Sequence, residues 1–81
     1  MPRTLSSPRH DALRDLLIQT RTKAGLTQHQ LAAALGRSQS YIASIERGQR
    51  RVDVVELLEL GEVMKFDAAA MMRKLSKLPI R

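Results

Sequence analysis

The sequence predicts an all-α fold, a single small domain of five helices in which the second and third form a helix-turn-helix. Two capping boxes, Thr27 with Gln30 and Asp53 with Glu56, mark the starts of two helices. In each box the first side chain accepts from an N–H of the first turn and the second reaches back to the cap. Apolar residues recur at helical spacing behind both boxes. A chain of 81 residues has room for one modest core.

The first helix is expected over about residues 8–24. Ser7 followed by Pro8 resembles an N-cap with proline at the first helical position, where the missing N–H costs nothing. The residues that recur on its inner side are Leu13, Leu16, Leu17, Thr20 and Ala24. Gly25 closes the helix.

Residues 1–6 show no periodic pattern and are expected to form a flexible N-terminal arm, which leaves residues 7–81 as the single domain. Arg3 in this arm is open to two interpretations. It reaches a neighbouring phosphate or groove, or it belongs to a terminus that simply frays.

The helix-turn-helix is expected over residues 27–48. In its first helix Leu31, Ala32 and Leu35 make one apolar face. Gly36 follows at the position where a left-handed residue is least costly. A helix that ends there is followed by a tight turn.

The second helix of the pair begins after Ser38, its expected N-cap, and ends at Gly48. Ile42 and Ile45 form a narrow inward stripe. The side chains left facing outward or sideways at its beginning are Gln39, Ser40, Tyr41 and Ser44. The second helix of a helix-turn-helix presents its N-terminal residues to base edges in the major groove.

The fourth helix begins after Asp53. Its inward face is expected to consist of Val54, Leu57, Leu60, Gly61 and Met64. Three acidic residues are expected on the opposite face, pointing away from nucleic acid, and these are Glu56, Glu59 and Glu62.

The last helix is expected from Ala68 to about Leu78, with Asp67 as its cap and Phe66 filling the core before it. Its large apolar residues exceed what one small core absorbs, and these are Met71, Met72, Leu75 and Leu78. Met72 and Leu75 are assigned to the core, whereas Met71 and Leu78 are open between the core and a partner subunit. The spare surface on Met71, Leu75 and Leu78 is the predicted dimer contact.

The charge of the chain is unevenly distributed. The formal net charge is +6, and residues 1–51 contain nine Lys and Arg against three acidic residues, whereas residues 52–81 contain five of each. Four arginines surround the second helix of the helix-turn-helix, and these are Arg37, Arg47, Arg50 and Arg51. This asymmetry indicates a face that meets a polyanion. On charge alone, a solvated basic surface is the simpler interpretation.

Several short segments in a fixed order carry a family resemblance, and these are Gly25-Leu26-Thr27-Gln28, Leu31-Ala32, Gly36, Ser40-Tyr41-Ile42 and Ile45-Glu46-Arg47-Gly48. They resemble the Cro/C1 class of phage-type repressors, the XRE family, over about residues 13–75. The resemblance implies a five-helix, lambda-repressor-like DNA-binding domain with its helix-turn-helix formed by helices 2 and 3. The chain departs from the family pattern at Gly61, where alanine is usual, and at Lys65, where a helix-ending glycine is usual.

The resemblance also implies roles for individual residues. Base contacts fall on Gln39, Ser40 and Ser44, and a glutamine amide suits adenine because it bonds N6 and N7 together. Gln28 matches a position that bonds the DNA backbone. By location, the further candidates for backbone contacts are Arg37, Tyr41, Arg50 and Arg51. For Tyr41 the alternative is a ring packed on the surface with a free hydroxyl.

The resemblance implies an ion pair between Arg21 and Glu46. A guanidinium presents a planar fork that matches a carboxylate, so this pair is expected to be structural. The functional alternative places Arg21 on a phosphate.

These features predict a sequence-specific transcriptional regulator that binds double-stranded DNA. The expected form is a repressor that binds a near-palindromic operator as a homodimer, with its recognition helix in the major groove. The alternative is an antitoxin-like or other protein-binding module in which DNA binding is secondary.

Other chemistry finds little support in the sequence. No enzyme is predicted, because there is no nucleophile motif and no glycine-rich phosphate loop. No cofactor, metal or small-molecule ligand is expected, since His10 and His29 have no acidic or cysteine partner at ligand spacing. The chain has no apolar run of membrane length, so we expect no membrane association. It also lacks cysteine, so nothing in it argues for secretion. A cytoplasmic location in a bacterial or phage system, on the nucleoid when DNA is bound, is the expectation.

Overall fold

The computed structural model describes residues 7–81, and within this range it contains five helices and no strand. The helices are α1 (Pro8–Lys23), α2 (Gln28–Leu35), α3 (Gln39–Glu46), α4 (Val54–Met64) and α5 (Ala68–Ser76). The predicted all-α fold is therefore confirmed, with α2 and α3 as the helix-turn-helix. The expected N-terminal arm, residues 1–6 with Arg3, lies outside the described residues.

Each helix begins at a side chain that caps it. The five capping side chains accept from the backbone N–H three residues further on, and they are Ser7, Thr27, Ser38, Asp53 and Asp67. Both capping boxes are complete, because Gln30 Oε1 accepts from its cap N–H at 2.9 Å and Glu56 Oε1 does so at 3.0 Å. Local sequence thus determines where the helices start.

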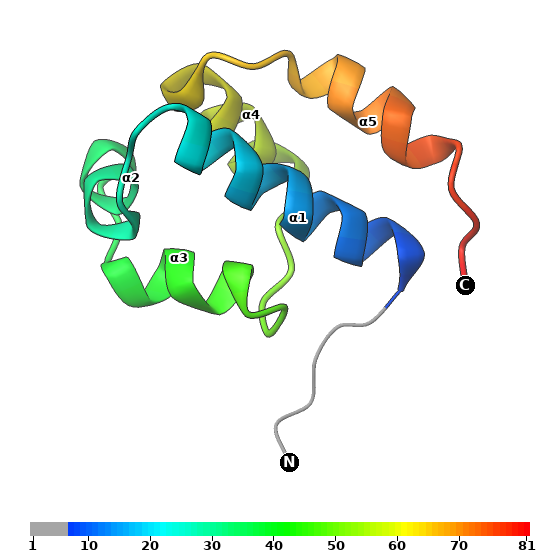
Figure 1. Cartoon of the computed structure of the whole chain (residues 1–81), viewed down its shortest axis with the longest axis horizontal. Helices are drawn as coiled ribbons and strands as arrows, with labels where there is room; N and C mark the ends of the chain where they lie inside the picture. Colours follow the sequence, from blue (N-terminus) through cyan, green and yellow to red (C-terminus); the bar gives the residue numbers. More distant parts are fainter. Residues whose placement is uncertain (1–6) are drawn as a thin grey trace.

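α1 lies between the helix-turn-helix and the last helix. It contacts both α3 and α5, which lie on opposite sides of it in Figure 1. The buried core that joins the helices consists of Leu17, Leu31, Ala32, Ile42, Ile45, Leu57, Leu60, Met64 and Ala68. Because Ile42 and Ile45 belong to this core, the inner face of α3 is fixed and its opposite face is left accessible.

Both departures from the family pattern lie in or beside the tight turn that ends α4. Lys65 adopts the left-handed conformation with φ of 63°, which costs a residue with a Cβ roughly 1–2 kcal/mol. The N–H of Phe66 donates to the Gly61 carbonyl at 3.0 Å. A Cβ on Gly61 would lie 3.0 Å from the Phe66 carbonyl oxygen, so the glycine permits this close return of the chain.

Three expectations about side-chain direction were wrong. Val54 is 58% exposed, and Val55 beside it is also exposed, so the first turn of α4 lies beyond the core. Met72 is 44% exposed, whereas Met71, one helical step away, packs against the core. Glu56 does not lie on an outer acidic face. It is only 5% exposed, because its side chain folds back to cap α4 and to meet two arginines.

The end of α5 also differs from expectation. The helix stops at Ser76, two residues before the expected end. The Leu78 N–H donates to the Leu75 carbonyl at 3.1 Å, so the chain continues as a turn. Leu75 and Leu78 are half-buried.

Candidate nucleic-acid interface

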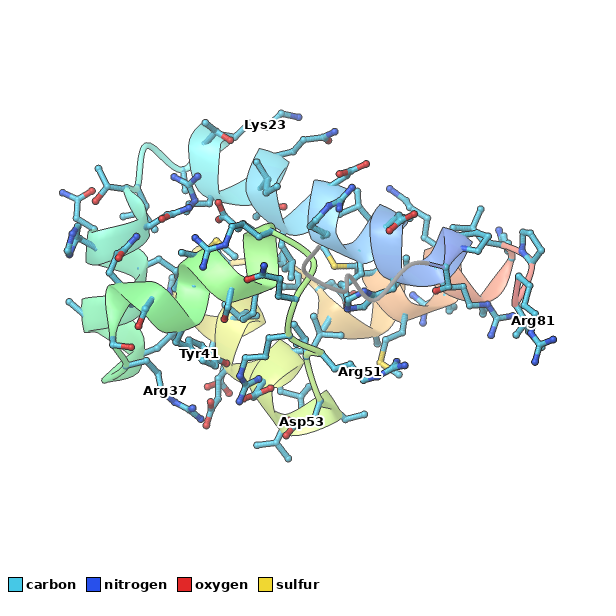
Figure 2. All side chains as sticks on the ribbon, turned by 90° about the horizontal axis from the view of Figure 1, so that it is seen from below. Lys23, Arg37, Tyr41, Arg51, Asp53 and Arg81 are labelled. Carbon is cyan, nitrogen blue, oxygen red and sulfur yellow. The ribbon has the colours of Figure 1, made fainter. Side chains whose placement is uncertain are left out.

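α3 presents a polar face on the side away from the core. Ser40 is exposed, and Gln39 and Ser44 are half-buried on the same helix. Figure 2 looks onto α3, which carries Tyr41, with Arg37 before the helix and Arg51 on the segment that follows it. The three residues expected to read bases therefore lie on one accessible helix.

Gln39 is the outer end of a continuous chain of side-chain hydrogen bonds. Its Nε2 donates to Gln28 Oε1 at 2.7 Å, and Gln28 Nε2 donates to Glu46 Oε1 at 2.8 Å. Arg21 closes the chain, with Nε donating to Glu46 Oε2 at 2.6 Å and Nη2 donating to Oε1 at 3.0 Å. These bonds link the start of α3 to α2 and to the end of α1.

Arg21 and Glu46 form the ion pair that the resemblance implied. Their side chains are 15% and 10% exposed, and Arg21 Nη1 also donates to the Leu26 carbonyl at 2.8 Å. The hydrogen bond to Glu46 raises the pKa of Arg21 despite the opposing effect of burial. The guanidinium is thus used inside the protein, in agreement with a structural role.

Arg37, Tyr41, Arg50 and Glu56 form a second group, which we call the arginine cluster. The guanidinium carbons of Arg37 and Arg50 lie 4.6 Å and 4.7 Å from the centre of the Tyr41 ring. Arg50 meets the Glu56 carboxylate through both Nη atoms, at 3.1 Å and 3.0 Å, and Arg37 Nη2 lies 3.8 Å from it. Two guanidinium groups therefore share one carboxylate and one ring.

Burial and hydrogen bonding shift two pKa values in this cluster. Burial, together with the hydrogen bond to Glu56, raises the pKa of Tyr41 to about 12. Burial alone would raise the pKa of Glu56, but bonds from the Asp53 N–H, Arg50 and Tyr41 outweigh it and hold that pKa below its usual value. Glu56 is therefore ionised and Tyr41 neutral at physiological pH.

Two further arginines flank α3. Arg47 is exposed, and its Nε donates to Gln49 Oε1 at 3.2 Å. Arg51 is exposed, and its carbonyl accepts from Arg50 Nη1 at 2.8 Å. Sequence reasoning had found the arginines around α3 but had missed Glu56 as the neighbour of Arg37 and Arg50, because the capping pattern with Asp53 already explained that residue.

The model of the helix-turn-helix domain family matches residues 12–74. The chain belongs to this family. Among solved structures, an XRE-family like protein from Pseudomonas syringae pv. tomato str. DC3000 shares 42% identity with a TM-score of 0.79, covering 85% of this chain and 84% of that one. The restriction-modification controller protein C.AhdI from Aeromonas hydrophila shares 33% identity with a TM-score of 0.68, covering 74% and 87%.

A curated relative agrees with the solved structures. It is y4dJ of Sinorhizobium fredii, described as an uncharacterized HTH-type transcriptional regulator, and it is 43% identical over 44 residues. The match spans 54% of this chain and 57% of that protein, so little more than half the length of the relative is compared. The resemblance to the XRE family is confirmed, and the fold is that of XRE-type helix-turn-helix DNA-binding domains.

Within residues 7–81, no three His, Asp or Glu residues come together in a way that would hold a metal ion. Over the same range, no helix is both long enough and apolar enough to cross a membrane.

Proposed function

We propose that the chain is a sequence-specific regulator that binds double-stranded DNA with α3 in the major groove. The observation that carries the proposal is the geometry of Gln39, which stands at the start of α3 and is held by Gln28. One N–H of the Gln39 amide is used in that bond, and its other N–H and its oxygen are left for N7 and N6 of adenine. Ser40 and Ser44 complete the proposed base-contacting set.

Phosphate contacts would seat α3 in the groove. The proposed set is Gln28, Arg37, Tyr41, Arg50 and Arg51. Gln28 is the first residue of α2, where the positive end of the helix favours an anion. The side chains of Arg37 and Arg50 are partly exposed, and Arg51 is exposed. Contacts of this kind fix the register of the protein on the duplex and carry no sequence information themselves.

We further propose that two copies act together as a repressor on a near-palindromic operator. One helix of eight residues reaches only a few base pairs, whereas a twofold pair reads two half-sites about 34 Å apart. The proposed contact is on α5 and the turn that follows it, at Met71, Leu75 and Leu78. Since Met71 packs partly on the core, the two leucines would carry most of it. The resemblance to phage-type repressors supports repression.

A gel shift with fragments of the host genome, paired with a pull-down from host extract, tests this proposal. We expect a small number of fragments to be retained at a salt concentration that releases the rest. Retention of no fragment together with capture of one specific protein would overturn the proposal in favour of a protein-binding module of the antitoxin type.

A further inference from the structure

Glu56 is the buried charged residue of residues 7–81, with 5% of its surface exposed. A carboxylate is rarely buried unless it is paired with a cation. This carboxylate faces two guanidinium groups, those of Arg50 and Arg37. Capping of α4 explains one bond of Glu56 but not its position between two arginines that border the DNA-binding helix.

The arginine cluster is half in the protein and half at the surface. The side chains of Arg37 and Arg50 are 41% and 40% exposed, whereas that of Glu56 is 6% exposed. A phosphate that approaches the cluster meets both guanidinium groups first and the carboxylate behind them. The carboxylate repels the phosphate, so the cluster acts with about one unit of positive charge rather than two.

The base-reading network does not include this carboxylate. Gln39 is linked to Gln28, Glu46 and Arg21, and none of these residues bonds to Glu56. A change of charge at Glu56 therefore alters the attraction to the DNA backbone and leaves the support of Gln39 in place.

We propose that Glu56 restrains the sequence-independent attraction of DNA to this surface and thereby raises the ratio of specific to non-specific affinity without touching DNA. This inference rests on the proposed DNA-binding function. Non-specific binding arises almost entirely from charge neutralisation, so it responds fully to the masked charge. In the specific complex the arginines act at fixed positions. There Glu56 compensates for the charge that it masks, because it holds the arginines against Tyr41 before DNA binds.

The test is Glu56→Gln, measured by fluorescence anisotropy on a labelled duplex of random sequence over a range of salt concentrations. Glutamine at this position keeps the capping box, so α4 is preserved, which circular dichroism checks. We expect the slope of log affinity against log salt to steepen by up to about 0.9, which corresponds to up to about eightfold tighter binding near 0.1 M salt. Affinity for a retained genomic fragment should rise less.

Glu62→Gln is the matched control. Glu62 lies exposed on the same helix, and its replacement changes the net charge by the same amount without involving the arginine cluster. Salt screens the charge of an exposed residue outside the arginine cluster, so we expect Glu62→Gln to have the affinity and the salt slope of the wild type.

The double variant Arg50→Gln with Glu56→Gln is an independent test of the masked charge, measured by the same salt slope. It also serves if Glu56→Gln alone does not fold. It leaves Arg37 as the cluster's free cation. If Glu56 masks one charge, the double variant has the wild-type slope. If both arginines act in full in the wild type, the slope flattens by about 0.9.

The inference is overturned if Glu56→Gln matches Glu62→Gln, if it weakens binding to the random duplex, or if the double variant has a flattened slope. A wild type that binds no duplex at low salt overturns the proposed function itself.

Discussion

Gln39 has to satisfy a protein partner and a base at the same time. Its bond to Gln28 fixes the amide, so that little freedom is lost when a base is contacted. We expect Gln39→Ala to cost about 1–3 kcal/mol on a retained genomic fragment and to relax preference at one base pair. Titration against fragments changed at each base pair measures this. Gln19→Ala, on the exposed side of α1, is the control that should change nothing. An unaltered profile for Gln39→Ala would remove Gln39 from the reading site.

Tyr41 is the single tyrosine of a chain without tryptophan, so its ionisation is followed cleanly by ultraviolet absorbance. We expect it to titrate with a pKa of about 12, because burial and Glu56 disfavour the phenolate. The raised pKa means that its stabilising contribution is complete below about pH 10 and is lost as the pH rises through 12. Glu56→Gln should lower the pKa. Titration of the folded wild type at the ordinary value near 10 would contradict the described environment.

At the level of residues, the ion pair between Arg21 and Glu46 could be predicted from the sequence and the one in the arginine cluster could not. The pairing of Arg21 with Glu46 was implied by a family pattern and is present. The pairing of Arg50 with Glu56 depends on how the turn between α3 and α4 folds back, and no residue spacing signals it. The capping pattern at Asp53 predicted the backbone bond of Glu56 correctly and its surroundings wrongly.

At the level of helices, the residue at which each helix begins could be predicted from the sequence, but the burial of some side chains could not. Caps act within four residues, so Ser7, Thr27, Ser38, Asp53 and Asp67 identified each start from sequence alone. Periodicity gives the buried stripe of a helix but not where along its length the core ends. Val54 was misassigned for that reason, because it shares a stripe with Leu57 yet lies past the core.

Lys65 offers a direct test of the turn that ends α4. We expect Lys65→Gly to stabilise the domain by about 0.5–1 kcal/mol, since glycine removes the cost of the left-handed conformation. Part of this gain is offset because glycine loses more conformational entropy on folding. The shift in the urea midpoint measures the effect. Lys77→Gly is the control, because Lys77 follows α5 with a φ of −81° and has no such strain. A variant at position 65 no more stable than the wild type would show that the turn is not strained.

At the scale of the whole molecule, the proposed dimer depends on the C-terminal end of the chain. Arg9 of α1 holds that end, with Nε donating to the Leu78 carbonyl at 2.9 Å and Nη2 to the Ser76 carbonyl at 3.3 Å. Leu75 and Leu78 are thereby kept in place beside α1.

We expect the wild type to sediment as a dimer, and Leu75→Glu or Leu78→Glu to sediment as a monomer, because a buried charge is not tolerated in an apolar contact. Ala69→Glu, exposed on the same helix, should remain dimeric. Circular dichroism excludes unfolding. Folded, dimeric leucine variants would place the contact elsewhere, and a wild type that stays monomeric even on DNA would defeat the dimer altogether.

The proposed function requires that this XRE-type domain reads DNA sequence rather than merely attracting DNA by its net charge of +6. The most direct measurement is the ratio of its affinities for two labelled duplexes of equal length and base composition, one with the retained genomic sequence and one with that sequence scrambled, at a single salt concentration. We expect the retained sequence to bind at least about a thousandfold more tightly, with two chains per duplex. Equal affinities for the two duplexes would contradict sequence reading by α3.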